Sequence, residues 1–589
     1  MVKSSFGDIM GFIAKRTKGK NTYYLYQESY REKINEKHSG KNPGSGKSRV
    51  RSRTEYLGSA EHILASVRNK RKPYSVKVRN FGLIAAAFQV SQKIDLVQIL
   101  KKHIHGNRSR IPRWIYFFVT IINRLDHATS KNKMSKWLKK TILPELLNFD
   151  HRKLTSKNFW YSTDDIISEK EIKMRREKKN GDDDLDLMVG IDDNTFNTIE
   201  TELFYSIDNL MGLSPGVICY DTTNFYTYIE EPARAKLANT CHSKDSKHHL
   251  KHVGLLMAVE KSYGIPLISR VYRANSHDSK LFSFILSDLI IALKKMCKSD
   301  SEIVIVLDKG NNSKENFKNM AGKISWVGAL VPSHYEELMN LEFDHYHGNW
   351  KEKLFYRCKR DVMGIECIIV LTFNSATKRK KQHSLKRGIE KLKQDIVKKW
   401  ESYKKTPTAI TQGIKTMKNK SRYGTCFEVS VDVYDKQLHF QENPEEIKKR
   451  EKRFGKNLIF SNMLDAETGY LIDTYNEKNI IESDFQLLKD TTIIRFRPIR
   501  HWTDSKIRAF AFCCVVSMTL VRVMQWMAQQ AGYEMSTNVL KDELTDKEEV
   551  INVCSLKEAE RMITQRSAVQ DKLWKTFNLE EIKDMLLLQ

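Results

Sequence analysis

Two short apolar runs rich in β-branched residues constrain the fold of this chain more than any other feature. They span 216–221 (GVICYD) and 302–308 (EIVIVLD), and turn-forming residues flank both. Runs of this kind are typical of strands that are buried on both faces of a sheet. Each run ends in an aspartate, so Asp221 and Asp308 are predicted at the sheet edge, where a ligand can approach. Taken singly, either aspartate is better explained as the start of a turn.

A third acidic residue lies in segment 475–489 (YNEKNIIESDFQLLK), which we predict to be one amphipathic helix. One narrow face, an arc of roughly 60° on the helical wheel, carries Tyr475, Lys478, Glu482 and Lys489. A separate sector is apolar except for Asp484, which does not fit the pattern. In isolation, the segment reads better as an ordinary surface helix with ion pairs.

Taken together, the three acids predict a metal-dependent site that acts on phosphate. Phosphoryl transfer on a nucleic acid is commonly supported by two Mg²⁺ ions about 4 Å apart. Mg²⁺ is a hard cation and prefers carboxylate oxygens to imidazole or thiolate ligands. On this hypothesis Lys478 and Lys489 would hold phosphate groups as point charges beside Glu482.

These residues resemble a known motif. Asp221, Asp308 and Glu482 resemble the DDE triad of bacterial insertion-sequence transposases, which have a ribonuclease H-like core. Segment 475–489 resembles the Y-x2-R-x3-E-x6-K signature of the insertion-sequence-four group, with Lys478 where arginine is usual. A lysine keeps the charge but loses the two-pronged phosphate contact of arginine.

Two further motifs extend the resemblance. The sequence DTTNF at 221–225 is similar to the first-acid motif of the group, and Asp308-Lys309-Gly310 is similar to the second, with Lys309 where arginine is common. The resemblance runs from about residue 203 to residue 525. It implies an α/β multidomain fold, in which a ribonuclease H-like mixed sheet is flanked by helices. A β-rich insertion would precede the catalytic glutamate helix, and a helical DNA-binding region would lie at the N-terminus.

The resemblance also implies an activity. Asp221, Asp308 and Glu482 would bind two Mg²⁺ or Mn²⁺ ions per active site, while Tyr475, Lys478, Lys489 and Lys309 would contact DNA or its phosphates. The enzyme would bind terminal inverted repeats as a homodimer on double-stranded DNA, cleave them, and join the 3′-OH ends to target DNA. Two alternatives stay open: a catalytically inactive DNA-binding protein derived from a transposase, and a stand-alone ribonuclease H-like nuclease.

The charge distribution favours a nucleic-acid partner. The formal net charge is +28, and the excess is concentrated in two blocks. Residues 1–80 hold 19 basic and 6 acidic residues, and residues 376–422 hold 16 basic and 3 acidic ones. Basic blocks of this kind suit a polyphosphate, because counterion release from the nucleic acid supplies much of the affinity.

Other features restrict the cellular setting. The nine cysteines form no CxxC pair, which argues for a reducing compartment and against a disulfide framework. A zinc site near Cys241, His242, His248, His249 and His252 is the weaker alternative to imidazoles beside a DNA groove. No apolar signal segment opens the chain, and the uncharged stretch 509–521 is too short to span a membrane, so we predict a buried helix there. We therefore expect a cytoplasmic, nucleoid-associated protein without a membrane partner.

Periodicity and composition divide the chain into predicted regions. Residues 1–80 form a basic region with β-strands, 81–165 a helical DNA-binding domain, and 166–200 a charged linker. The core would comprise 201–331 and 457–530, interrupted by a β-rich basic insertion at 332–456. Residues 531–589 are predicted to be helical. Within the insertion, tryptophans such as Trp350 or Trp400 are candidates for stacking on an extruded base.

Overall fold

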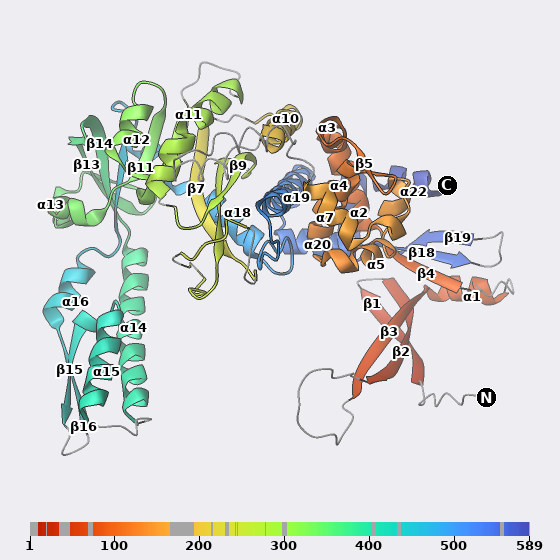
Figure 1. Cartoon of the computed structure of the whole chain (residues 1–589), viewed down its shortest axis with the longest axis horizontal. Coiled ribbons are helices and arrows are strands. Elements are labelled where there is room, and N and C mark those ends of the chain that lie inside the picture. Colours follow the sequence, from red (N-terminus) through yellow and green to blue (C-terminus); the bar gives the residue numbers. More distant parts are fainter. Residues whose placement is uncertain are drawn as a thin grey trace.

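The protein has a mixed α/β fold, seen in a computed structural model (Figure 1). The structure describes residues 10–18, 21–33, 48–68, 75–164, 194–213, 216–229, 235–241, 243, 245–276, 278–296, 303–401, 407–432, 437–553 and 559–587. Most of the predicted charged linker at 166–200 therefore lies outside the described residues. Its last part, 194–200, begins helix α10 (Asn194–Met211).

A nine-stranded mixed sheet forms the centre of the molecule, in the order β12-β13-β14-β17-β11-β10-β7-β8-β9. Strands β7, β10 and β11 run parallel, and the other neighbouring pairs are antiparallel. The strands are β7 (Val217–Tyr226), β8 (His252–Glu260), β9 (Pro266–Arg273), β10 (Val304–Leu307), β11 (Ser325–Ala329), β12 (Gly348–Trp350), β13 (Lys353–Val362), β14 (Ile365–Phe373) and β17 (Lys456–Ser461). Both apolar runs with a terminal aspartate are thus confirmed as buried strands, β7 and β10.

Helices cover the sheet, and one of them is unusually apolar. They include α11 (Asp278–Met296), α12 (Lys314–Met320), α13 (Glu336–Met339), α17 (Thr468–Asn476), α18 (Asn479–Lys489) and α19 (Asp504–Gln530). Helix α19 has the length and hydropathy of a membrane span, but 89% of its apolar window is buried inside the protein. The predicted buried helix at 509–521 is therefore confirmed as part of α19, a central core helix.

The N-terminal helices do not form a core of their own. They are α2 (Gly82–Lys93), α3 (Leu96–His103), α4 (Arg113–Leu125), α5 (Met134–Leu138), α6 (Leu143–Leu146) and α7 (Ser156–Asp164). Their apolar side chains join the same hydrophobic cluster as α19 and the central sheet. The buried Ser517 hydroxyl of α19 donates to the carbonyl of Ile121 in α4, at 3.0 Å. Figure 1 shows α2, α4 and α7 beside α19.

The C-terminal region is not purely helical, in contrast to the prediction for 531–589. It contains α20 (Thr537–Thr545), α21 (Ala568–Thr576) and α22 (Leu579–Leu587), but also β18 (Glu548–Val553) and β19 (Ala559–Ile563). Strand β18 pairs with β4 (Ser75–Asn80) from the N-terminal region. The strand pattern escaped prediction because its partner lies at the other end of the chain.

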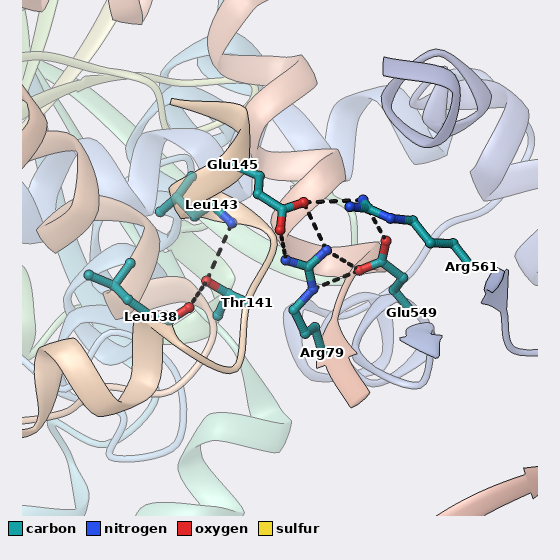
Figure 2. A network of polar contacts seen from close by, with 7 residues as sticks. All are labelled: Arg79, Leu138, Thr141, Leu143, Glu145, Glu549 and Arg561. Carbon is teal, nitrogen blue, oxygen red and sulfur yellow. Dashed lines mark hydrogen bonds and ion pairs between the residues drawn. The ribbon is translucent and has the colours of Figure 1, made fainter. Parts of the chain in front are cut away.

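An ion network holds these two ends together (Figure 2). The Arg79 guanidinium of β4 donates to Glu549 of β18 at 2.7 Å from Nε, and to Glu145 of α6 at 2.5 Å from Nη1. Arg561 of β19 donates to the same Glu145 at 3.2 Å. Glu549 is almost completely buried, with 3% of its side chain exposed, so this network is part of the core.

Residues 375–455 form a separate lobe that leaves the sheet between β14 and β17. The lobe contains α14 (Ser375–Glu401), α15 (Pro407–Lys420), β15 (Phe427–Asp432), β16 (Gln437–Glu442) and α16 (Pro444–Glu451), around its own hydrophobic cluster. Figure 1 shows it extending away from the sheet. The predicted insertion at 332–456 was too long, because β14 pairs with β17 and β13 pairs with β14, so both strands belong to the central sheet.

A second small unit lies near the N-terminus. Strands β1 (Met10–Lys18), β2 (Asn21–Lys33) and β3 (Ser48–Gly58) form an antiparallel sheet, which is followed by α1 (Ala60–Arg68). Short segments 107–108 and 111–112 pair as a small hairpin before α4. The strands predicted within residues 1–80 are confirmed in β2 and β4.

Candidate active site

Asp221 and Asp308 lie at the same level of two adjacent parallel strands. The last residues paired between β7 and β10 are Cys219 and Val306, and each aspartate follows two residues later. The apolar run ends at Asp221, but β7 itself continues to Tyr226 through its pairing with β8. The pairing of β7 with β10, however, stops before Asp221. The carboxylates of Asp221 and Asp308 therefore lie where the two strands separate.

The predicted single helix over 475–489 is two helices. Helix α17 ends at Asn476 and α18 begins at Asn479, with Glu477 and Lys478 forming the join. The Lys478 amide donates to the Tyr475 carbonyl at 3.4 Å, which is the tighter spacing of a 3₁₀ turn. A helical wheel assumes one straight axis, so it cannot detect this break. Tyr475 and Glu482 nevertheless lie on the same side as the aspartates, because all four groups act electrostatically on the Lys478 ammonium.

The Lys478 ammonium lies among the predicted acids. Its Nζ is 3.4 Å from Asp308 Oδ1 and 3.3 Å from Glu482 Oε1. Burial alone would lower the pKa of Lys478, but Tyr475 and the three predicted acids outweigh it and raise that pKa above its usual value. Asp308 and Glu482 therefore share one positive charge, and Asp221 is near enough to contribute to the pKa shift of Lys478.

Asp308 and Glu482 offer carboxylate oxygens to the same cation. In the described part of the chain, no three histidine, cysteine, aspartate or glutamate side chains are close enough to hold a metal ion together. Asp308 and Glu482 instead share the Lys478 ammonium, and their side chains are 38% and 49% exposed. Two solvent-accessible carboxylates that already share a cation have the oxygen chemistry that Mg²⁺ requires.

The other predicted phosphate-binding residues lie at different distances from this centre. Tyr475 is partly buried, and burial raises its pKa; the Lys478 ammonium is 5.7 Å from its ring centroid. Lys309 is exposed directly after Asp308. Lys489 shares α18 with Glu482, but lies about 10 Å further along the helix axis. Its ammonium is 5.7 Å from the ring centroid of Phe225.

Asp484, which did not fit the helical pattern, has a structural partner. The Arg522 guanidinium of α19 donates to Asp484 Oδ1 from Nε at 2.8 Å and from Nη2 at 2.6 Å. Among the described residues, Asp484 Oδ2 has no hydrogen-bond partner. Complete burial raises the pKa of Asp484 to about 7, although Arg522 opposes that shift. This aspartate therefore anchors α18 to α19 and does not face the three acids.

The histidine and cysteine side chains near residue 245 stabilise a turn. His252 Nε2 and the Ser243 hydroxyl are 3.0 Å apart, and the Ser243 amide donates to His248 Nδ1 at 3.4 Å. Cys241 accepts a hydrogen bond from the Asn224 side chain at 3.6 Å. Among the described residues these groups form no metal cluster, and His242 lies outside that part of the chain.

The two tryptophans that we considered for base stacking differ in their surroundings, because Trp350 is 37% exposed. Trp350 belongs to β12 of the central sheet and packs over Gly469 of α17. Trp400 packs against the hydrophobic cluster of the lobe.

A second group of candidate functional side chains was missed from sequence. Arg495, Arg497 and Arg500 follow α18 in a loop that runs to His501. The Arg497 guanidinium donates to the Lys489 carbonyl at 3.3 Å and forms an ion pair with Asp245. The three arginines in the segment RFRPIR were the available sequence signal. They indicate a site only when the residues that surround them are known.

Comparisons with known proteins identify no family. No protein-family profile and no curated protein sequence matches this chain. A solved structure of the piggyBac transposase synaptic complex with hairpin DNA is similar at 10% sequence identity, over 80% of this chain and 82% of that chain. The TM-score is 0.38, which is too low to carry an argument about fold or function.

Proposed function

We propose that this protein is a DNA transposase with a DDE active site, and that Asp221, Asp308 and Glu482 are its catalytic carboxylates. The observation that carries the proposal is their convergence around Lys478, from two parallel strands and one helix. The order β9-β8-β7-β10-β11, antiparallel and then parallel, supports a ribonuclease H-like core. The membership of the insertion-sequence-four group stays a proposal based on sequence resemblance.

On this proposal, the three carboxylates hold two Mg²⁺ or Mn²⁺ ions. When bound, such ions neutralise the developing charge of phosphoryl transfer and activate the attacking hydroxyl group. The protein supplies the fixed positions of the carboxylates through the β7–β10 register and the α17–α18 join. Lys478 holds two of those carboxylates in the absence of divalent ions, and Lys478, Lys309 and Lys489 contribute positive charge for DNA phosphates.

The proposed partner is double-stranded DNA. The protein would bind the terminal inverted repeats of its own element as a homodimer, cleave them and join the 3′-OH ends to a target. The lobe supports this proposal, because α14 and α15 place much of the second basic block on one projecting unit. A reducing, cytoplasmic location at the nucleoid would follow from this role.

The test is cleavage of duplex oligonucleotides that carry the DNA flanking the coding sequence, in Mg²⁺ or Mn²⁺. The wild type should nick them at one position, and Asp308→Asn should lower the rate by about 10³-fold, because several kcal/mol of transition-state stabilisation is lost. Binding to the same DNA should persist. Glu366→Gln, which removes an exposed charge from β14 of the same sheet, is the matched control. Equal cleavage by Asp308→Asn and wild type would refute the proposed active site.

A further inference from the structure

A pocket of about 530 Å³ opens between the N-terminal helices and the loop that follows α18. This volume is within the range of ligand-binding pockets. Six basic side chains line it: Arg124, Lys131, Lys133, Arg495, Arg497 and Arg500. None of its lining residues is acidic. We call it the arginine pocket, and its composition indicates an anionic ligand.

Arg124 gives the strongest evidence for an anion. It belongs to α4 and only 6% of it is exposed. Its Nη2 donates to the Thr129 carbonyl at 2.6 Å and to the Asn123 side chain at 2.9 Å, both of which are uncharged. Within the described part of the chain, its Nε has no hydrogen-bond partner and no carboxylate forms an ion pair with it. An arginine keeps its charge, and a buried charge without a counter-ion is costly, so a bound anion would remove this cost.

The neighbouring groups add positive charge to the arginine pocket. The pKa of His501 is held well below its usual value by burial together with the charges of Lys131, Arg124 and Lys506. The ammonium groups of Lys131 and Lys506 are 5.3 Å and 4.4 Å from the ring centroid of Trp160. A neutral imidazole and an indole thus lie among several cations. Among the basic side chains that line the pocket, Arg497 forms an ion pair with Asp245, which does not line the pocket.

The arginine pocket and the candidate active site are connected by one strand. The loop after α18 extends the pairing of β7, because the Tyr228 amide donates to the Ile499 carbonyl at 2.8 Å. Six residues of extended chain separate Asp221 from Thr227, which forms a bridge with Ile499. At ~3.3 Å per residue this is a separation of about 20 Å. Phosphates of one DNA strand advance ~3.4 Å per nucleotide along the helix axis and also turn around it, so a straight distance of about 20 Å spans a few nucleotides.

We propose that the arginine pocket binds one DNA phosphate, a few nucleotides from the phosphate that is cleaved at the three acids. The inference rests on the proposed transposase function and adds a positioning site to it. Arg124 and the loop arginines fix the register of the strand, while the carboxylates perform the cleavage. Phosphate contacts of this kind set the position of a protein on DNA without reading its sequence.

The test uses end DNA in which single phosphates are replaced, one at a time, by neutral methylphosphonates. With wild-type protein, one replacement a few nucleotides from the cut should weaken binding by ~10–100-fold, as expected for a lost charged hydrogen bond. Arg124→Gln should weaken binding of unmodified DNA similarly, and should make that replacement harmless. Arg500→Ala removes an exposed side chain, so it should fold and show a smaller effect at the same position.

The control is Lys575→Ala, which removes an exposed positive charge that does not line the pocket. This variant should keep the wild-type pattern along the DNA. Suppose that every methylphosphonate weakens DNA binding by the pocket variants as much as it weakens binding by the wild type, and that the wild type still binds and cleaves. The arginine pocket is then refuted and the proposed function stands. If wild-type protein neither binds nor cleaves end DNA, the proposed function itself fails.

A second arm separates a DNA phosphate from a free one. Inorganic phosphate is titrated into wild type and Arg124→Gln, and the melting temperature is measured. Inorganic phosphate should stabilise only the wild type, and at high concentration it should compete with end DNA. Stabilisation by inorganic phosphate without any effect of the pocket variants on DNA binding would show a small-anion site and overturn the proposal.

Discussion

Two buried arginines in this protein have opposite surroundings. Arg79 donates to the carboxylates of Glu145 and Glu549, and both acids are supplied by the fold. Burial alone would lower the pKa of Arg79, but these two partners raise it above the usual value. Burial lowers the pKa of Arg124, and the charged guanidinium of Arg495 lowers it further. The charge of Arg79 is neutralised within the chain, whereas the charge of Arg124 is left for a ligand.

The same contrast separates acidic residues. Asp484 is paired with Arg522 inside the core, far from bulk solvent. Asp308 and Glu482 lie at an accessible edge, where a single lysine is shared between them. Charges that the fold satisfies stabilise it, whereas charges left accessible or incompletely paired are the candidates for chemistry. This difference separates structural ion pairs from functional ones more reliably than residue type does.

The largest stability effect should come from Arg79→Ala. The substitution leaves Glu549 buried without a complete partner set, and removal of one member of a buried ion pair costs about 3–5 kcal/mol. We expect a drop of that size in the free energy of unfolding, measured by chemical denaturation. Arg152→Ala, which breaks a pair with Asp150 on the surface, should cost far less. If the two variants lost equal stability, the Arg79 network would not be a structural element.

A pH-dependent effect is expected from Asp484. Its pKa of about 7 exceeds the ordinary value, so the folded protein retains a proton that the unfolded chain loses near pH 4. Stability from this group should therefore fall as the pH rises from about 4 to about 7, by up to ~1.4 kcal/mol per unit of pKa difference. Asp484→Asn should remove this part of the slope in denaturation experiments across that range. An unchanged slope would show that Asp484 is ionised throughout.

A smaller effect should distinguish Lys478 from the other lysines. The ammonium and a divalent cation compete for Asp308 and Glu482, so Lys478→Ala should bind Mg²⁺ more tightly. Two accessible ion pairs of ~0.2–1 kcal/mol each correspond to a gain of roughly two- to thirty-fold. Lys309→Ala removes a nearby charge without these contacts, and isothermal titration of both variants isolates the effect. Equal Mg²⁺ affinities in the two variants would contradict the competition.

Much of the central sheet could be predicted from sequence because its signals are local. The apolar runs predicted β7 and β10, and Met363-Gly364 is a local turn signal between β13 and β14. Both turn residues have positive φ angles, at 58° and 90°. Glycine takes such angles without strain, which is why it marks turns so clearly.

The remaining features depend on contacts between distant segments. Arg79 and Glu549 are 470 positions apart, so no periodicity links them. The arginine pocket combines residues from 120–160 with others from 495–510, and neither group indicates a site alone. The break between α17 and α18 was missed because both sides have helical composition, while the direction of each axis is set by packing.

The account depends most directly on whether the three acids bind metal. We would count the Mn²⁺ ions bound per chain by electron paramagnetic resonance in the presence of uncleaved end DNA. Wild-type protein should bind two ions, and Asp221→Asn, Asp308→Asn and Glu482→Gln should each lower the number or the affinity, whereas Glu366→Gln should not. Wild-type Mn²⁺ binding in all three variants, or no bound ion in the wild type, would contradict the proposed active site.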